Sequence, residues 1–391
     1  MKAAGPTRRS LVFRFARGAG VVSLCLMTFS LFRFLACVAA LVTTARMAPI
    51  AQFAAAAQPQ LAPSGDGRAW LVFGRGSEIF AAGSDRGGTT FAPPVKVADI
   101  PKLMLGMRRG PRIAAHGANV TVTAVGAELF AFHSADAGRT WSSPTVINEI
   151  SRCAREGLQG LAAASDGRVF LTWLDLRNGK MELWGAESAN GGQSWGANQL
   201  VYRSPAKSIC ECCHPSALFD AEGNLGLMWR NSLEGARDLW FSSRTARAPA
   251  FSPAVKRGEG SWKLEACPMD GGNIIALGGG KFASVGQRAG QIVFAAVDGS
   301  ELILGPGKQP VAIAQPGGIL LFWQQGSDLV TARISSAGVK TPTVVHATDA
   351  RFPTLVALGN GQALLAFEQG PAKGTAAVVV EKLALVSLAN R

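Results

Sequence analysis

A repeat of roughly fifty residues constrains this chain more than any other feature of its sequence. Three segments share an acidic, an aliphatic and an aromatic residue, followed by a turn that ends in a second aromatic residue: 78–91, 128–141 and 182–195. A fourth segment, 238–251, keeps this frame but lacks the turn residues. The final aromatic residues recur at 91, 141, 195 and 251, a spacing typical of β-propeller blades. We therefore predict an all-β propeller.

The turns within these repeats have a recognisable chemistry. In the second copy, Ser134 and Asp136 precede Gly138, and Trp141 closes the segment. Serine and aspartate oxygens accept backbone N–H bonds in tight turns, and glycine adopts the positive φ that such turns need. We expect these turns to be structural and to lie between the third and fourth strands of a blade, away from any catalytic site.

A second pattern counts the blades. A glycine precedes an aromatic residue by six positions at Gly67 to Phe73, Gly167 to Trp173, Gly223 to Trp229, Gly317 to Trp323 and Gly361 to Phe367, and weaker copies lie at 120–125 and 281–286. This count predicts seven blades, with a six-bladed propeller as the alternative. The last unit is too short for a fourth strand, so the start of the mature chain is expected to supply it and to close the ring.

The first 57 residues differ from the rest of the chain. They contain seven basic residues and no acidic one, and two apolar stretches separated by Arg33. This pattern predicts an export leader at 1–57, followed by a propeller domain at 58–391. The segment 7–12 resembles a twin-arginine signal. Because Arg33 leaves each apolar stretch shorter than a bilayer requires, we expect a periplasmic or secreted protein without a membrane span in its mature form.

The net charge of the chain limits the classes of ligand that it is expected to bind. The chain has 39 basic and 26 acidic residues, and loss of the leader removes about half of this excess. The remaining charge gives no reason to expect nucleic acid, but it suits an anionic ligand such as an acidic glycan or another anionic small molecule.

The candidate binding and catalytic residues fall in loops that a propeller places at one end of its ring. The links between blades are expected at 99–112, 148–158, 202–215 and 257–271, with smaller turns of the same face at 174–181 and 230–237. Convergent loops on a rigid scaffold are where propellers carry function. The predicted anion-binding residues are Arg108, Arg109, Arg112, Arg155, Arg230, Arg237 and Trp262.

Cysteines form the most distinctive local motif of the mature chain. The segment 208–215 contains Cys210, Cys212, Cys213 and His214, and Cys267 opens the next blade. An oxidising compartment favours disulfides among Cys153, Cys210, Cys212, Cys213 and Cys267. Five is an odd number, which leaves a thiol free. The alternative is therefore a soft-metal site, for copper or zinc, built from Cys210, Cys212, Cys213, His214 and Cys267.

These motifs together resemble a known family. The segments in question are 108–113, 155–158, 210–215, 229–231, 237–238 and 267–272. They look like exported propellers with Asp-box (BNR) repeats, a sialidase-like group often labelled exo-alpha-sialidase. Such a resemblance implies an arginine cluster that binds a sugar carboxylate, and a tyrosine nucleophile paired with a glutamate. Tyr202 is the only tyrosine, and our register places it on an outer strand.

A glycosidase without a tyrosine nucleophile would need two carboxylates roughly 5 to 10 Å apart. The candidates are Glu156, Asp175, Glu265 and Asp270. Two functions thus remain open. One is the binding or hydrolysis of an anionic glycan at an arginine-rich mouth. The other is a non-hydrolytic propeller that acts as an interaction scaffold, with a cysteine-rich metal or disulfide site.

Overall fold

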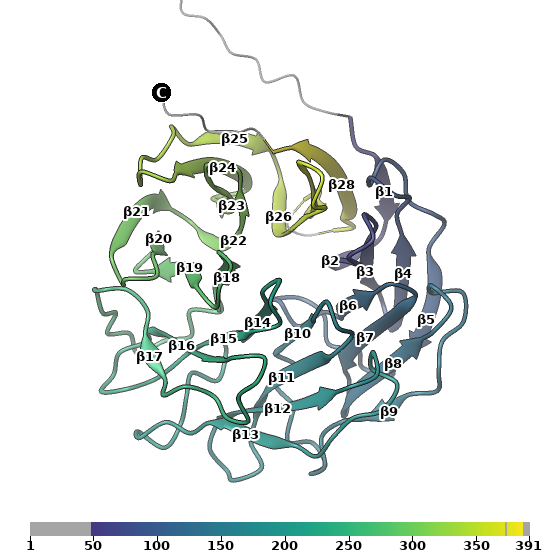
Figure 1. The fold of residues 1–391 in the computed structure, drawn as a ribbon, viewed down its shortest axis with the longest axis horizontal. Helices are drawn as coiled ribbons and strands as arrows, with labels where there is room; N and C mark the ends of the chain where they lie inside the picture. The colour runs from purple at the N-terminus through teal and green to yellow at the C-terminus, as the bar shows by residue number, and fades with distance from the viewer. Residues whose placement is uncertain (1–47, 372–373, 386–391) are drawn as a thin grey trace, which may run out of the picture. The chain divides into compact units, whose positions relative to one another are not determined.

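The computed structural model describes residues 48–371 and 374–385 (Figure 1). The predicted leader lies outside these residues up to position 47. The described part contains 28 strands and no helix, and the strands form seven antiparallel sheets of four. The predicted seven-bladed, all-β propeller is confirmed. Among the described residues there is accordingly no helix long and apolar enough to cross a membrane.

Each of the first four sheets runs in chain order from its inner to its outer strand. They are β2 (Ala57–Pro63), β3 (Ala69–Arg75), β4 (Glu78–Gly83) and β5 (Val95–Asp99); β6 (Arg112–His116), β7 (Asn119–Val125), β8 (Leu129–Ser134) and β9 (Thr145–Val146); β10 (Gln159–Ala163), β11 (Val169–Asp175), β12 (Glu182–Ser188) and β13 (Gln199–Tyr202); β14 (Ser216–Phe219), β15 (Leu225–Arg230), β16 (Leu239–Arg244) and β17 (Val255–Lys256).

The last three sheets follow the same order, except that the outer strand of the seventh comes from the start of the chain. They are β18 (Asn273–Ala276), β19 (Phe282–Arg288), β20 (Gln291–Ala295) and β21 (Glu301–Pro306); β22 (Lys308–Gln315), β23 (Gly318–Gln325), β24 (Asp328–Ser335) and β25 (Val344–Ala347); β26 (Ala350–Ala357), β27 (Gln362–Gln369), β28 (Ala377–Ala384) and β1 (Ala51–Ala54).

Strand β1 closes the ring from the N-terminal side of the propeller, as predicted, but it lies within the predicted leader. Ala51 pairs with Val380 of β28, and the amide of Ile50 donates to the carbonyl of Val380 at 2.9 Å. The sheet structure therefore begins before the predicted domain start at residue 58. Cleavage near Ala57 would remove β1 and expose the edge of β28, so the boundary at 57 does not coincide with the start of the folded unit.

The core lies between neighbouring sheets. The second strand of each sheet is sandwiched between two other blades, so both of its faces are buried, and β3 and β11 are apolar along nearly their whole length. Trp173, Trp229 and Trp323, the aromatics of the six-residue spacing, are fully buried at this level. This packing explains why the spacing of glycine and aromatic residues counts the blades.

The repeated turns lie where they are predicted, between the third and fourth strands. Asp136 accepts the amide of Thr140 at 2.9 Å, and Asn190 accepts the amide of Ser194 at the same distance. Gly138 has a φ of 73°. These turns occupy one end of the sheets, and the links between blades occupy the other.

Candidate functional site

The seven inner strands surround a cavity of about 410 Å³. They are β2, β6, β10, β14, β18, β22 and β26, which lie around the centre of the ring in Figure 1. The size is within the range of small-molecule pockets. Most residues of the wall have apolar side chains, although polar and apolar atoms contribute about equally to its surface, and Arg108, Arg112 and His214 line the end that receives the links between blades. No acidic side chain of the described residues lines the cavity.

Arg108 and Arg112 form the positive end of this cavity. Both are buried, with exposed fractions of 8% and 7%. Arg108 donates from Nε to the side chain of Gln309 and from Nη1 to the carbonyl of Pro353 at 2.8 Å. Arg112 donates from Nε to the carbonyl of Gln159 at 3.2 Å and from Nη2 to the carbonyl of Arg108. Neutral groups therefore hold both guanidinium groups in place.

The positive charge of the two arginines is only weakly compensated. Within the described residues, neither forms an ion pair. Burial lowers the pKa of Arg108 to about 10, although Asp270 and Glu368 oppose this shift. Burial and then the charge of Arg108 lower the pKa of Arg112 to about 9. Glu368 already pairs with Arg351 at 2.9 Å. Both arginines stay cationic at neutral pH, so an excess of buried positive charge faces the cavity.

His214 lies beside the arginines, not beside the cysteines. Its Nδ1 accepts the amide of Gly271 at 3.3 Å, and its Nε2 donates to the carbonyl of Gly272 at 3.1 Å. Burial, and then the charges of Arg108 and Arg112, lower the pKa of His214 well below its ordinary value. The ring is thus neutral and both nitrogens are occupied. The prediction of His214 as a metal ligand is not supported by this geometry.

Hydrogen bonds from Arg230 to Asp270 connect β15 to the link that precedes β18. Arg230 donates from Nε and Nη2 to the carbonyl of Asp270 at 3.0 and 2.9 Å, and from Nη1 to the carbonyl of Arg237. Trp262 lies under Arg230, with 5.6 Å between the guanidinium carbon and the ring centroid. None of these four residues lines the cavity.

The remaining predicted anion-binding arginines lie outside the cavity wall. Arg109 is half-buried and donates from Nε to the carbonyl of Glu156 at 2.7 Å, while Arg155 is exposed. Arg237 is half-buried, and its Nε lies 3.5 Å from the carbonyl of Leu264. Of the seven predicted residues, the structure brings only Arg108 and Arg112 to the cavity.

Asp175 is a structural carboxylate. It is fully buried and accepts hydrogen bonds from Cys153 Sγ at 2.9 Å, Trp173 Nε1 at 2.8 Å, and Arg177 Nε and Nη2, both at 3.0 Å. Burial alone raises the pKa of Asp175, but the hydrogen bonds from Arg177 and Cys153 outweigh burial and lower it. Both oxygens are occupied, so Asp175 has no free atom for a substrate.

The other predicted catalytic acids do not form a pair at the cavity. Asp270 is buried and accepts the amides of Gln309 at 2.6 Å and Gly272 at 3.1 Å. Glu156 is half-buried, Glu265 is exposed, and neither lines the cavity. Among the residues that the structure describes, the arrangement of two facing carboxylates that glycoside hydrolysis requires does not occur there.

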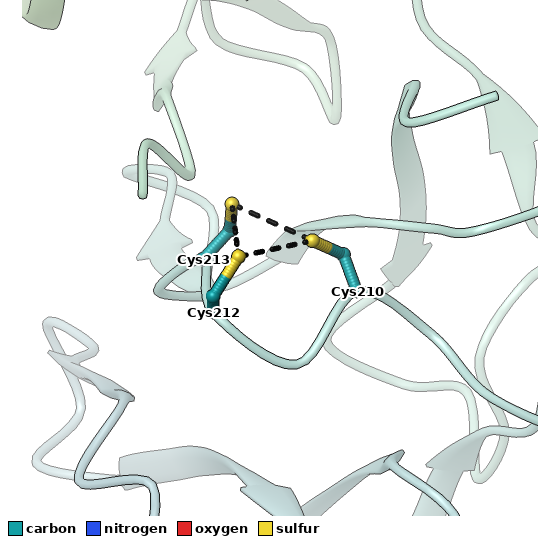
Figure 2. Close-up of side chains that lie close together, drawn as sticks. All are labelled: Cys210, Cys212 and Cys213. Atoms are coloured by element: carbon teal, nitrogen blue, oxygen red, sulfur yellow. Dashed lines mark hydrogen bonds between the residues drawn. The ribbon is translucent and has the colours of Figure 1, made fainter. Parts of the chain in front are cut away.

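Three cysteines meet in a second site within the link between β13 and β14. The Sγ atom of Cys210 lies 3.6 Å from that of Cys212 and 3.7 Å from that of Cys213, and the latter two are 3.9 Å apart (Figure 2). All three are buried. Donation from the other two thiols lowers the pKa of Cys210 below its ordinary value, and the charge of Arg237 adds to this effect.

The other cysteines lie apart from this group. Cys153 donates to Asp175, and burial followed by this carboxylate raises the pKa of Cys153 to about 12. Cys267 is exposed and is not part of the group. All five cysteines of the described residues are unbonded in the structure. Of the five predicted metal ligands, three come together.

Sequence reasoning missed Gln309, which positions Arg108, and its counterpart Gln58, which bonds to Glu368. Gln58 and Gln309 precede a proline at the start of an inner strand, and both have positive φ, 55° and 56°. Each lies at a shift of strand register; the side chain of Gln58 bonds to Glu368, and that of Gln309 bonds to Arg108. The recurring dipeptide with proline at these strand starts is the signal that could have found them.

Comparison with known proteins supports the fold. No model of a protein family matches the sequence, and no curated protein matches it. Among solved structures, the chain is similar to YCF48 bound to D1 peptide, with 13% identity over 88% of this chain and 96% of that chain and a TM-score of 0.53. It is also similar to YCF48 from Cyanidioschyzon merolae, with 12% identity over 85% and 97% and a TM-score of 0.50.

A sialidase fold is also among the similar structures. The leech intramolecular trans-sialidase is 11% identical over 84% of this chain and 68% of that chain, with a TM-score of 0.48. At such identities the likeness concerns the fold alone. The class that the structure defines is therefore a seven-bladed β-propeller with a central cavity.

Proposed function

We propose that this protein binds a small anion with an apolar body in its central cavity and does not hydrolyse it. The observation that carries this proposal is the pair Arg108 and Arg112, two buried cations without an ion-pair partner among the described residues that line the cavity. A buried charge is costly unless an opposite charge compensates it. A carboxylate, phosphate or sulfate group bound there would supply that charge and could accept an N–H group of Arg108 that its bonds to Gln309 and Pro353 leave free.

The cavity wall favours an apolar ligand body over a sugar. Several polar side chains of the wall are already engaged between neighbouring strands: Ser216 donates to the carbonyl of Gly272 at 2.9 Å, Asn273 accepts the amide of Ala312 at 3.0 Å, and Thr354 accepts the amide of Leu61 at 3.1 Å. A sugar would bring many hydroxyl groups that lose their hydrogen bonds to water. An aliphatic or aromatic body would bury against the apolar side chains of the wall without this loss.

The absence of a carboxylate pair at the cavity supports binding without hydrolysis. We also propose that the protein acts outside the cytoplasm, because residues 1–47 have the basic, acid-free and apolar composition of an export leader. A leader peptidase would then cleave before β1, since the ring needs this strand.

Calorimetric titration with octanoate tests the proposal, because octanoate combines a carboxylate with an apolar body. Octanamide serves as the neutral analogue and sialyllactose as the sugar. We expect octanoate to bind and both other compounds to bind at least about tenfold more weakly, since a hydrogen bond to a charged group contributes about 1.5–3 kcal/mol. Arg108→Gln and Arg112→Gln should each weaken octanoate binding by about tenfold to a hundredfold.

Arg139→Gln is the matched control. Arg139 is exposed in a turn at the opposite end of the sheets and donates to the carbonyl of Asp136 at 2.9 Å. This variant should bind octanoate like the wild type, and thermal melts check that all variants fold. If octanamide bound as tightly as octanoate, Arg108 and Arg112 would not recognise the carboxylate, and the proposal would be wrong. Tighter binding of sialyllactose, or turnover of a fluorogenic sialoside, would instead support the glycan function.

A further inference from the structure

We propose that Cys210, Cys212 and Cys213 bind one copper ion as Cu(I), at a site distinct from the anion cavity. None of the three cysteines lines the cavity. They belong to a single link between two blades, and the tight turn of this link directs all three sulfur atoms toward one point (Figure 2).

The spacing of the sulfur atoms fits a shared metal ion. Their separations are 3.6, 3.7 and 3.9 Å. Metal–thiolate bonds of about 2.3 Å place sulfur atoms around one ion about 3.8 to 4.0 Å apart, in tetrahedral or trigonal geometry. A disulfide would require about 2.05 Å. The three thiols therefore need only a small adjustment to become ligands.

The residues that pack around the three cysteines also indicate a metal site that uses sulfur ligands. The small buried cluster around these residues consists of Cys210, Cys212 and Cys213, with Met269 packed against it. An ordinary apolar cluster of this size would contain aliphatic or aromatic side chains, as the other core clusters of the described residues do. Here every member contributes a thiol or a thioether.

A buried arginine lies beside the cluster. The amide of Cys210 donates to the carbonyl of Arg230 at 3.0 Å, and Arg230 is 2% exposed. Three thiolates around a monovalent ion carry a net charge of about −2, which the guanidinium group of Arg230 offsets in part. Backbone carbonyls hold Arg230 in place, so its charge is fixed beside the cluster before the metal binds.

The available donors favour Cu(I) over Zn²⁺. Zinc usually takes four thiolate, imidazole or carboxylate ligands. The described residues add no imidazole or carboxylate to this group, and both nitrogens of His214 are engaged elsewhere. Thiolate and thioether ligands select Cu(I), and the thioether side chain of Met269 packs against the cluster.

Binding involves no change of oxidation state. Each cysteine that coordinates copper loses its thiol proton to solvent, and the ion arrives and stays as Cu(I). Burial of the three sulfur atoms keeps oxidants away from the bound ion, which suits a site that works in an oxidising compartment.

The test uses the full chain, purified under reducing and anaerobic conditions and titrated with Cu(I) against the chromogenic chelator bicinchoninate. We expect about one copper ion per chain, measured by mass spectrometry of the metal, and X-ray absorption that reports sulfur neighbours only. Cys210→Ser and Cys213→Ser should lose copper to the chelator. Met269→Leu should retain it more weakly than the wild type.

Cys153→Ser and Cys267→Ser are matched controls, because these cysteines lie outside the cluster. Both should retain copper like the wild type. Thermal melts of the metal-free variants separate misfolding from loss of a ligand. The proposal is overturned if the wild type yields its copper to the chelator, if Cys267→Ser loses copper equally, or if equimolar Zn²⁺ displaces it.

Discussion

Replacement of Asp175 by alanine tests whether this residue is structural, as its contacts indicate, or catalytic, as its place in the sequence suggested. Asp175 lies at the end of β11, and its carboxylate joins Cys153, Trp173 and Arg177. Arg177 in turn stacks on Trp184, with 3.6 Å between the guanidinium carbon and the ring centroid. The substitution would therefore leave several donors without their acceptor.

The expected loss follows from burial. The side chain of Asp175 is fully buried, while that of Arg177 is 10% exposed. Removal of one partner from a buried ion pair costs about 3–5 kcal/mol. The indole N–H of Trp173 would also lose its acceptor, and an unsatisfied buried donor costs about 1–3 kcal/mol. Because Arg177 can reach water in part, we expect a total loss of about 3–5 kcal/mol in the free energy of unfolding.

Urea denaturation followed by tryptophan fluorescence measures this loss. Its pH dependence gives a second readout, because the pKa of Asp175 is lowered in the folded protein. A carboxylate with a lowered folded-state pKa stabilises the fold above its unfolded pKa of about 3.9, and this contribution is lost as the pH falls through the folded value. Asp175→Asn should flatten the stability profile below about pH 4.

Asp99→Ala provides the comparison. Asp99 is exposed and forms a surface pair with Lys96 at 3.6 Å, so its removal should change stability by less than about 1 kcal/mol. A similarly small change for Asp175→Ala would refute the structural role of this carboxylate. Hydrolysis of a glycoside by the wild type and not by Asp175→Asn would restore the catalytic assignment.

Three further predictions follow from the fold and its titratable groups. A chain that starts at residue 58 lacks β1. It should melt about 5 °C lower than the full chain and self-associate on size-exclusion chromatography, because the edge of β28 is then exposed. An unchanged melting temperature would contradict the role of β1 in closing the ring. In the metal-free protein at pH 8, iodoacetamide should modify exposed Cys267 well before Cys153, whose pKa is raised to about 12, and peptide mass spectrometry would reveal equal labelling if this is wrong. Because the pKa of His214 is lowered in the folded protein, the wild type should lose stability as the pH falls below about 6.5. The variant His214→Asn should lose less stability over the same range. Identical denaturation profiles for the two proteins would contradict a buried, neutral His214.

The architecture could be predicted from the sequence because local interactions specify it. The turn at Ser134 to Trp141 closes through hydrogen bonds between residues four positions apart, and the buried tryptophans follow their glycine turns at a constant spacing. Both features recur along the chain at the spacing of the blades. Their period is sufficient to predict the class of fold, the number of blades, and the end of the ring at which the links gather.

The partners of each polar side chain depended on the tertiary structure. Arg108 bonds to Gln309 and Pro353, which are 201 and 245 positions away along the chain. His214 and Cys213 are adjacent in sequence, yet one lines the cavity and the other joins the sulfur cluster. Closure of the ring brings distant links into contact, and the backbone conformation of each link decides where neighbouring side chains point. The sequence alone therefore predicted which loops gather at one end of the ring, whereas only the packed ring separated the cationic cavity, the buried carboxylates and the sulfur site.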